Sequence, residues 1–184
     1  MKKQGFTLIE LMVVIVIMGI LAAVAVPKLF GMIAKSKASE VGPAAGTYVK
    51  LQDAYASEAN KFGSWKLIGY VAPGAKSAGD EGETTNFKYY GGTAPAIDGA
   101  DGYALSGDGD KVFAEEAVWG AVNVAALNEC AIQTATTAAD AHWKVSAKAA
   151  DNGNSLLYKA EVSADCKPLT PTFDALSSKG YDAD

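Results

Sequence analysis

The sequence predicts an α+β fold in which a long N-terminal α-helix packs on a head built around an antiparallel β-sheet. Three features carry this prediction: a long apolar run near the N-terminus, a following segment with apolar residues at three- and four-residue spacing, and a C-terminal third in which apolar and polar residues alternate. With 184 residues, of which 49% are hydrophobic, the chain suffices for one globular domain and an accessory element.

The first element is the apolar segment 6–27, which only Thr7 and Glu10 interrupt before a wholly apolar run from Leu11 to Val26. As an α-helix rising about 1.5 Å per residue it reaches roughly 33 Å, enough to cross a bilayer core of about 30 Å. Lys2 and Lys3 precede it, and positive flanks stay in the cytoplasm. We therefore expect the rest of the chain to be exported.

Two ordinary explanations of this segment are a cleavable secretory signal, ending near the small residues Ala23 and Ala25, and a plain membrane anchor. Neither explains Glu10. A carboxylate within an apolar helix carries a free-energy cost, so such a residue usually has a partner.

The residues GFTLIELMVVI at positions 5–15 closely resemble the N-terminal motif of the type IV pilin and pseudopilin family. The resemblance implies that residues 1–5 are a leader, removed on the cytoplasmic side by a prepilin peptidase that cuts between Gly5 and Phe6. The same enzyme then methylates the new amine of Phe6. The apolar helix stays on the mature protein, and Pro27 stands where the family tends to carry a proline.

The resemblance further implies the pilin fold, with the apolar half of the helix in the membrane or in a filament core. The implied function is that of a structural subunit, a major pilin that polymerises with itself into an extracellular type IV pilus for adhesion, twitching motility or surface attachment. The implied partners are the prepilin peptidase/N-methyltransferase, an inner-membrane assembly platform and, before assembly, the membrane itself. The precursor would lie in the inner membrane and the mature protein in a pilus on the cell surface.

The side-chain chemistry of the motif is consistent with a role for Gly5 in cleavage and for Glu10 in assembly. Gly5 offers no side chain, which suits a backbone that must approach a peptidase closely. Glu10 can pair with the Phe6 amine of a neighbouring subunit, and an unpaired carboxylate in a helix bundle would be penalised. The pair would therefore select subunits that enter at the correct axial step.

The segment 28–62 is predicted to be the amphipathic half of the helix, lying on a sheet. Proline removes a backbone donor and clashes with the preceding turn, so we expect bends at Pro27 and at Gly42 and Pro43. Gly19 and Pro27 bracket a stretch that could lose helicity on assembly. The expected apolar face comprises Val41, Ala44, Ala45, Tyr48, Leu51, Tyr55, Ala59 and Phe62.

The segment 63–115 is rich in glycine and aspartate and is predicted to be a long connecting loop with short apolar islands at 65–71 and 87–90. Some pseudopilins carry a calcium-binding loop, and carboxylates are ligands for that ion. The spacing matches no fixed calcium motif, and Asp-Gly pairs are ordinary turn formers. No cofactor is expected, and the weak calcium candidates are Asp98, Asp101, Asp108 and Asp110.

The segment 116–184 is predicted to hold antiparallel sheet. Apolar and polar residues alternate over 143–148 and 156–163, and the turn sequence at 151–154 joins them into a hairpin. Another strand is expected within 118–127. Cys130 and Cys166 are the only cysteines, so in an exported domain we expect a disulfide that encloses the hairpin.

Catalytic motifs are absent from the sequence, so the protein is predicted not to be an enzyme. The single histidine, His142, is expected to be a surface or core residue rather than a base. Sixteen lysines and no arginine stand against 21 acidic residues, which argues against nucleic-acid binding as the default.

Two alternative functions stay open. One is a major pseudopilin of a type II secretion system, which acts in protein secretion; a disulfide argues against it and the Asp-Gly loop weakly for it. The other is a membrane-anchored carbohydrate-binding module that would use exposed aromatic rings. The candidate rings are Trp65, Tyr70, Tyr89, Tyr90 and Tyr103.

Overall fold

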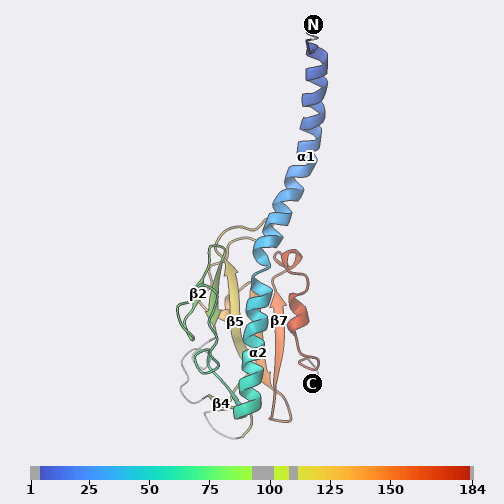
Figure 1. Cartoon of the computed structure of the whole chain (residues 1–184). Coiled ribbons are helices and arrows are strands. Elements are labelled where there is room, and N and C mark those ends of the chain that lie inside the picture. The colour runs from blue at the N-terminus through green and yellow to red at the C-terminus, as the bar shows by residue number, and fades with distance from the viewer. Residues whose placement is uncertain (1–4, 93–101, 108–111, 183–184) are drawn as a thin grey trace.

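The computed structural model describes residues 5–92, 102–107 and 112–182. Figure 1 shows a long helical stalk that projects from a head, with the second half of the helix lying across a β-sheet. The N-terminus is at the far tip of the stalk and the C-terminus is in the head. The predicted α+β architecture, a long apolar helix packed on an antiparallel sheet, is confirmed.

The stalk is helix α1 (Leu8–Ala38), and within this fully described helix Ala34 and Ala38 are the buried residues. Both lie at its C-terminal end, where the helix first meets the head. Lys35 and Lys37 occupy its last turn, where positive charge interacts favourably with the helix dipole. The stalk therefore keeps its shape by its own backbone hydrogen bonds and not by packing against the head.

Helix α2 (Val41–Ala59) continues the chain after a short break at Ser39 and Glu40. Pro43 accounts for the position of the break: it has no N–H for the carbonyl of Ser39, four residues earlier, and its ring crowds that carbonyl. The interruption thus lies one turn before the expected position at Gly42 and Pro43, both of which are helical.

The face of α2 that packs on the sheet follows the predicted spacing in its first half, where Tyr48 is fully buried. In the second half Leu51 and Tyr55 are only partly buried, and Ala59 is exposed. The helix ends at Asn60, which has a left-handed backbone with φ of 52°. The expected end at residue 62 is therefore wrong, because the next two residues form a strand.

The main sheet has five strands in the order β2-β3-β5-β6-β7, and every neighbouring pair is antiparallel. A separate two-stranded sheet pairs β1 with β4. The strands are β1 (Lys61–Phe62), β2 (Gly82–Glu83), β3 (Phe87–Gly91), β4 (Tyr103–Ala104), β5 (Glu116–Asn123), β6 (Trp143–Ala149) and β7 (Leu156–Val162).

Strand β3 corrects the expectation that 63–115 is one long connecting loop. It pairs with β5 along its whole length, from Phe87 opposite Asn123 to Gly91 opposite Trp119. Its alternating burial is that of a strand with one face in the core. Five residues are too few for a decisive periodicity, and the pairing partner lies far along the sequence, so local pattern alone did not identify the strand.

Strand β5 is the central strand, and its last six residues are buried. It contacts α2, and it also contacts the short 3₁₀ helix η1 (Ala138–Asp140). A Cβ added to Gly120 would lie 2.7 Å from the Cα of Ala138, so glycine lets this backbone approach closely. A shift in pairing register between Ala117 and Trp119 interrupts the ladder around Val118, and the carbonyl of Val118 accepts a hydrogen bond from the Trp65 indole at 3.1 Å.

The predicted hairpin is confirmed: β6 and β7 pair from Trp143 opposite Val162 to Ala149 opposite Leu156. The chain then forms two short 3₁₀ helices, η2 (Lys167–Leu169) and η3 (Phe173–Leu176), and η3 contacts β7.

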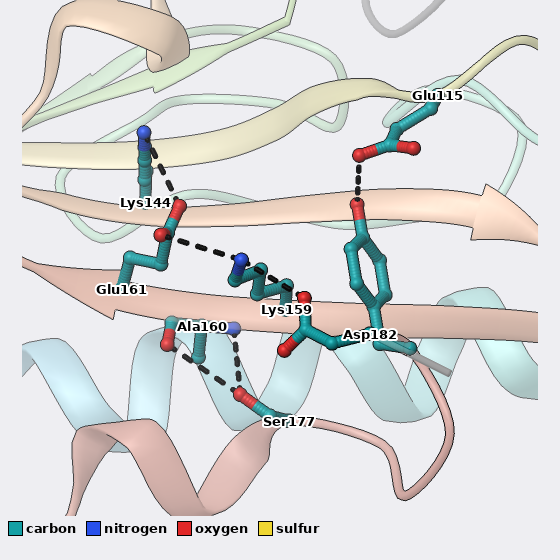
Figure 2. A network of polar contacts seen from close by, with 8 residues as sticks. Glu115, Lys144, Lys159, Ala160, Glu161, Ser177 and Asp182 are labelled. Carbon is teal, nitrogen blue, oxygen red and sulfur yellow. Dashed lines mark hydrogen bonds and ion pairs between the residues drawn. The ribbon is translucent and has the colours of Figure 1, made fainter. Parts of the chain in front are cut away.

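The polar contacts in Figure 2 tie the C-terminal residues to β7 and to Glu115, the residue before β5. Ser177 Oγ accepts the N–H of Ala160 at 2.9 Å, and Tyr181 donates its hydroxyl to Glu115 at 2.8 Å. Lys159 pairs with Asp182 at 3.0 Å, and this contact together with nearby carboxylates raises the pKa of Lys159. These contacts hold the C-terminal tail against the hairpin.

Candidate functional site

The exposed end of α1 is organised by a capping box between Thr7 and Glu10. Glu10 donates its N–H to Thr7 Oγ1 at 3.3 Å, while Glu10 Oε2 accepts the N–H and the hydroxyl of Thr7 at 2.9 and 2.6 Å. Such a reciprocal pair satisfies donors that a helix N-terminus leaves free. In the single chain, therefore, the Glu10 carboxylate has a local polar partner.

The surface around this carboxylate is apolar and exposed. Glu10 lies in a shallow hollow on the side of the helix together with Phe6, Ile9, Val13 and Val14. Phe6 is 81% exposed and Ile9 67%. The sequence reasoning therefore placed Glu10 correctly within an apolar surface, although its role toward a second chain stays a prediction.

The apolar surface continues along the stalk as far as Ile33, where large apolar side chains remain exposed. The helical stretch Leu8–Ala59 is long and apolar enough to cross a membrane, and its most apolar stretch is not buried against the rest of the molecule. Soluble chains rarely expose so much contiguous apolar surface without a partner. This stalk surface requires lipid or another protein to cover it.

The processing residues lie at the tip of the stalk. Gly5 and Phe6 precede the capped helix, and nothing lies within 4 Å of a Cβ added to Gly5. The residues that the structure describes thus place no steric demand on Gly5. A requirement for glycine there would have to come from the peptidase, so the cleavage and methylation assignments stay predictions.

The residues expected to bend the helix fall into two groups. Gly19 and Pro27 lie inside α1, which is helical through both positions, and Gly42 and Pro43 lie in the first turn of α2. Figure 1 shows that the combined helix follows a gently curved path. Loss of helicity between Gly19 and Pro27 on assembly stays a prediction for the filament.

The expected disulfide is present between Cys130 and Cys166, both fully buried, with their Cα atoms 4.6 Å apart. It encloses the β6–β7 hairpin. His142 lies beside it, 8% exposed, with its ring nitrogens 2.6 Å from Ser163 Oγ and 3.1 Å from the Ala131 carbonyl oxygen. His142 is thus a core histidine with two partners, as the sequence favoured.

The four calcium candidates, Asp98, Asp101, Asp108 and Asp110, lie outside the described residues. Within residues 5–92, 102–107 and 112–182, the group close enough to share a metal ion is Cys130, His142 and Cys166. Its two sulfur atoms are bonded to each other, which removes them as thiolate ligands. The calcium hypothesis therefore stays a prediction.

The aromatic residues considered for carbohydrate stacking are mainly core residues. Trp65, Tyr70 and Tyr89 are at most 1% exposed, while Tyr90 and Tyr103 are partly buried. Tyr70 lies edge-on to Trp65, with ring centroids 4.8 Å apart. The first three rings cannot stack on a sugar without unfolding the head, which removes most of the basis for that alternative.

Two residues of the helix were not singled out from the sequence. Thr7 caps α1, and the threonine with a glutamate three residues later was a recognisable signal for this. Glu40, at the break between the helices, accepts hydrogen bonds from residues 44 and 49 positions further along the chain. No local pattern could have indicated those partners.

Comparison with known proteins finds the same N-terminal motif that the sequence indicated. Residues 1–26 match the family model described as "Prokaryotic N-terminal methylation motif". The type IV major pilin protein PilA of Myxococcus xanthus is 41% identical over 61 residues, 33% of this chain and 28% of that protein. The type IV major fimbrial protein FimA of Dichelobacter nodosus is 56% identical over 39 residues, 21% of this chain and 25% of that protein.

The fimbrial protein EcpC of Eikenella corrodens is 36% identical over 100 residues, 54% of this chain and 59% of that protein. The chain therefore matches between about a quarter and three-fifths of the length of these relatives. No solved structure gives a significant match. The chain therefore carries a prokaryotic N-terminal methylation motif, has a long apolar helix on an antiparallel sheet, and is similar over part of its length to proteins named type IV major pilin and fimbrial protein.

Proposed function

We propose that this protein is a structural subunit, the major pilin, of a type IV pilus, and that it polymerises through α1 into an extracellular filament. The observation that carries this proposal is the stalk itself: an exposed apolar helix with one carboxylate near its tip, attached to a folded head. Only the C-terminal end of α1, at Ala34 and Ala38, takes part in the core of the head, so the rest of the stalk is available for association.

The apolar stalk would be covered in turn by two environments. In the precursor, lipid covers it, and the inner membrane is the expected location. In the filament, the stalks of other copies replace the lipid and the heads face outward. Burial of apolar surface contributes roughly 25 cal/mol per Å², so a stalk apolar on all sides favours a helix bundle over exposure to water.

Glu10 would fix the axial offset between neighbouring stalks. Apolar packing alone tolerates axial slippage, since one apolar side chain can replace another at a helix interface. The charged Phe6 amine and the Glu10 carboxylate of a neighbouring copy satisfy each other at one axial offset only. In the single chain the capping box holds this carboxylate, and one of its oxygens, Oε2, takes both hydrogen bonds from Thr7. None of the described residues donates a hydrogen bond to the other oxygen, Oε1, and this is the oxygen that would accept a bond from a neighbour.

Assembly requires removal of residues 1–5, because the amine of Phe6 does not exist before cleavage. The expected partners are the prepilin peptidase/N-methyltransferase and an inner-membrane assembly platform. The names of the relatives, a major pilin and fimbrial proteins, support a pilus rather than a secretion pseudopilus. Adhesion, twitching motility and surface attachment are the expected uses of such a filament.

Mass spectrometry of sheared surface filaments tests the proposal. The main protein band is expected to begin at a methylated Phe6 and to keep Cys130 joined to Cys166. Glu10→Ala is expected to leave leader removal intact and to abolish or misassemble filaments. A secreted chain that begins at Val26 would mean that the stalk is discarded, and the proposed function would then be wrong.

A further inference from the structure

Glu40 lies in the break between α1 and α2, where the stalk joins the head. It is the N-cap residue of α2, yet its side chain makes no capping hydrogen bond to that helix. Instead the carboxylate reaches the sheet: Glu40 Oε1 accepts the hydroxyl of Thr84 at 2.7 Å and that of Tyr89 at 2.9 Å. A single oxygen therefore joins the helix break to the β2–β3 hairpin.

Both donors are themselves held in place. Thr84 Oγ1 accepts the backbone N–H groups of Asn86 and Phe87 at 3.3 and 3.1 Å. Its hydroxyl proton has two acceptors within reach, and Glu40 Oε1 at 2.7 Å is much closer than the Phe87 carbonyl oxygen at 3.3 Å. Tyr89 is fully buried, and its ring centroid is 5.8 Å from that of Trp119. Burial, followed by the bond to Glu40, raises the pKa of Tyr89, so its hydroxyl stays protonated as a donor.

A second tie lies one turn further along the helix. Tyr70 donates its hydroxyl to the Ala44 carbonyl at 3.3 Å and accepts the Trp119 indole N–H at 2.8 Å. After Ala44, α2 continues to pack on the sheet. Before the break, only the C-terminal end of α1 is buried. Glu40 therefore lies in the short region, from Ala34 onward, over which the helix first packs on the head.

A small change in helix direction at Glu40 would displace the tip of the stalk by a large distance. At about 1.5 Å per residue, α1 extends roughly 46 Å beyond the break. A swing of about 10° at the break would move the tip by roughly 8 Å, close to the 8–10 Å that separates packed helices. Such a displacement would carry Glu10 away from the amine of a neighbouring subunit.

We propose that Glu40 is a positioning residue for assembly: by clamping the helix break to Thr84 and Tyr89, it fixes the direction of α1 relative to the head. Its consequence for the filament rests on the proposed function, whereas the clamp itself is a property of the single chain. The loss of hydrogen bonds to a charged acceptor is expected to lower the ratio of clamped to released chains roughly tenfold or more.

The clamp is tested on the full-length chain in detergent, with spin labels at Lys28→Cys in α1 and Ala139→Cys in η1, both exposed positions. Electron-electron double resonance measures the distance distribution between the labels. Glu40→Ala is expected to broaden or shift it. Glu40→Gln is expected to preserve it, because the amide oxygen can accept both hydroxyls. The matched control is Glu83→Ala, which removes a carboxylate in an exposed ion pair with Lys88 and is expected to change nothing.

Thr84→Val and Tyr89→Phe remove one donor each and leave the carboxylate in place, so each is expected to give a partial version of the Glu40→Ala effect. Melting temperature is measured alongside. If Glu40→Ala lowers the melting temperature but leaves the label distances unchanged, Glu40 serves only stability and the proposal is wrong. The proposal is equally overturned if Glu83→Ala broadens the distribution as much as Glu40→Ala.

The second part of the experiment measures filament yield and axial rise per subunit for the same variants. Glu40→Ala is expected to reduce the filament yield or to alter the axial rise per subunit, and Glu40→Gln to restore the wild-type value. Normal filaments from Glu40→Ala, despite a broadened distribution, would overturn the role in assembly. If the wild-type chain forms no filaments while the label distances respond as expected, the proposed function fails and the clamp stands.

Discussion

Glu10 has two roles in this account, as a cap for α1 and as an ionic partner for a neighbouring subunit, and two substitutions separate them. Glu10→Gln removes the charge but keeps an oxygen that can accept the N–H of Thr7, and glutamine is an accepted residue at this position of a capping box. Thr7→Val keeps the charge but removes the hydroxyl that accepts the Glu10 N–H and donates to its carboxylate.

The expected magnitudes follow from these contacts. Thr7→Val leaves one of the three Thr7–Glu10 hydrogen bonds, from the Thr7 N–H at 2.9 Å. Loss of an N-cap side chain costs about 1 kcal/mol, which frays the first turn but leaves the rest of α1 helical. Glu10→Gln leaves the Phe6 amine buried without its counter-charge, and uncompensated burial of this kind lowers an association constant roughly a hundredfold or more.

The assay compares sheared filaments with cell-associated protein by immunoblot and electron microscopy, with intact mass as a check on leader removal. We expect Glu10→Gln to be processed but largely unassembled, and Thr7→Val to assemble at a modestly reduced yield. The opposite ranking, with normal filaments from Glu10→Gln and none from Thr7→Val, would show that Glu10 acts as a cap, and the ionic register argument would be wrong.

Two further predictions concern the head. Replacement of Cys130 and Cys166 by serine opens a loop with a sequence separation of 36, and the chain-entropy model gives a loss of about 4 kcal/mol in unfolding free energy; denaturant titration of the full chain in detergent checks this, and an unchanged midpoint would contradict it. Gly120→Ala places a Cβ 2.7 Å from the backbone of Ala138 and is expected to destabilise by about 1–3 kcal/mol. In the same titration the matched change Gly46→Ala, whose Cβ would meet only Leu176 at 3.8 Å, is expected to be neutral or to stabilise the helix by up to about 1 kcal/mol. A Gly120→Ala chain as stable as Gly46→Ala would show that η1 moves away at no cost.

Much of the molecule follows from local sequence. The apolar stalk is an unbroken apolar run, the hairpin strands alternate with a period of two, and the turn between them is a cluster of turn-forming residues. Each of these signals is carried by neighbouring residues. The N-terminal methylation motif was recognisable because its residues are consecutive in the chain. The disulfide needed no structure either, since two cysteines allow a single pairing within one chain.

What the sequence could not decide were contacts between residues far apart in the chain. Strand β3 became a strand by pairing with β5. Tyr70 is buried against Ala44 and Tyr48 of α2, which lie far from it in the sequence. The hydrogen bonds that Glu40 accepts from Thr84 and Tyr89 depend likewise on where the sheet lies. Secondary-structure period is a property of neighbouring residues, whereas burial and hydrogen bonding across the core exist only once the chain has brought distant segments together.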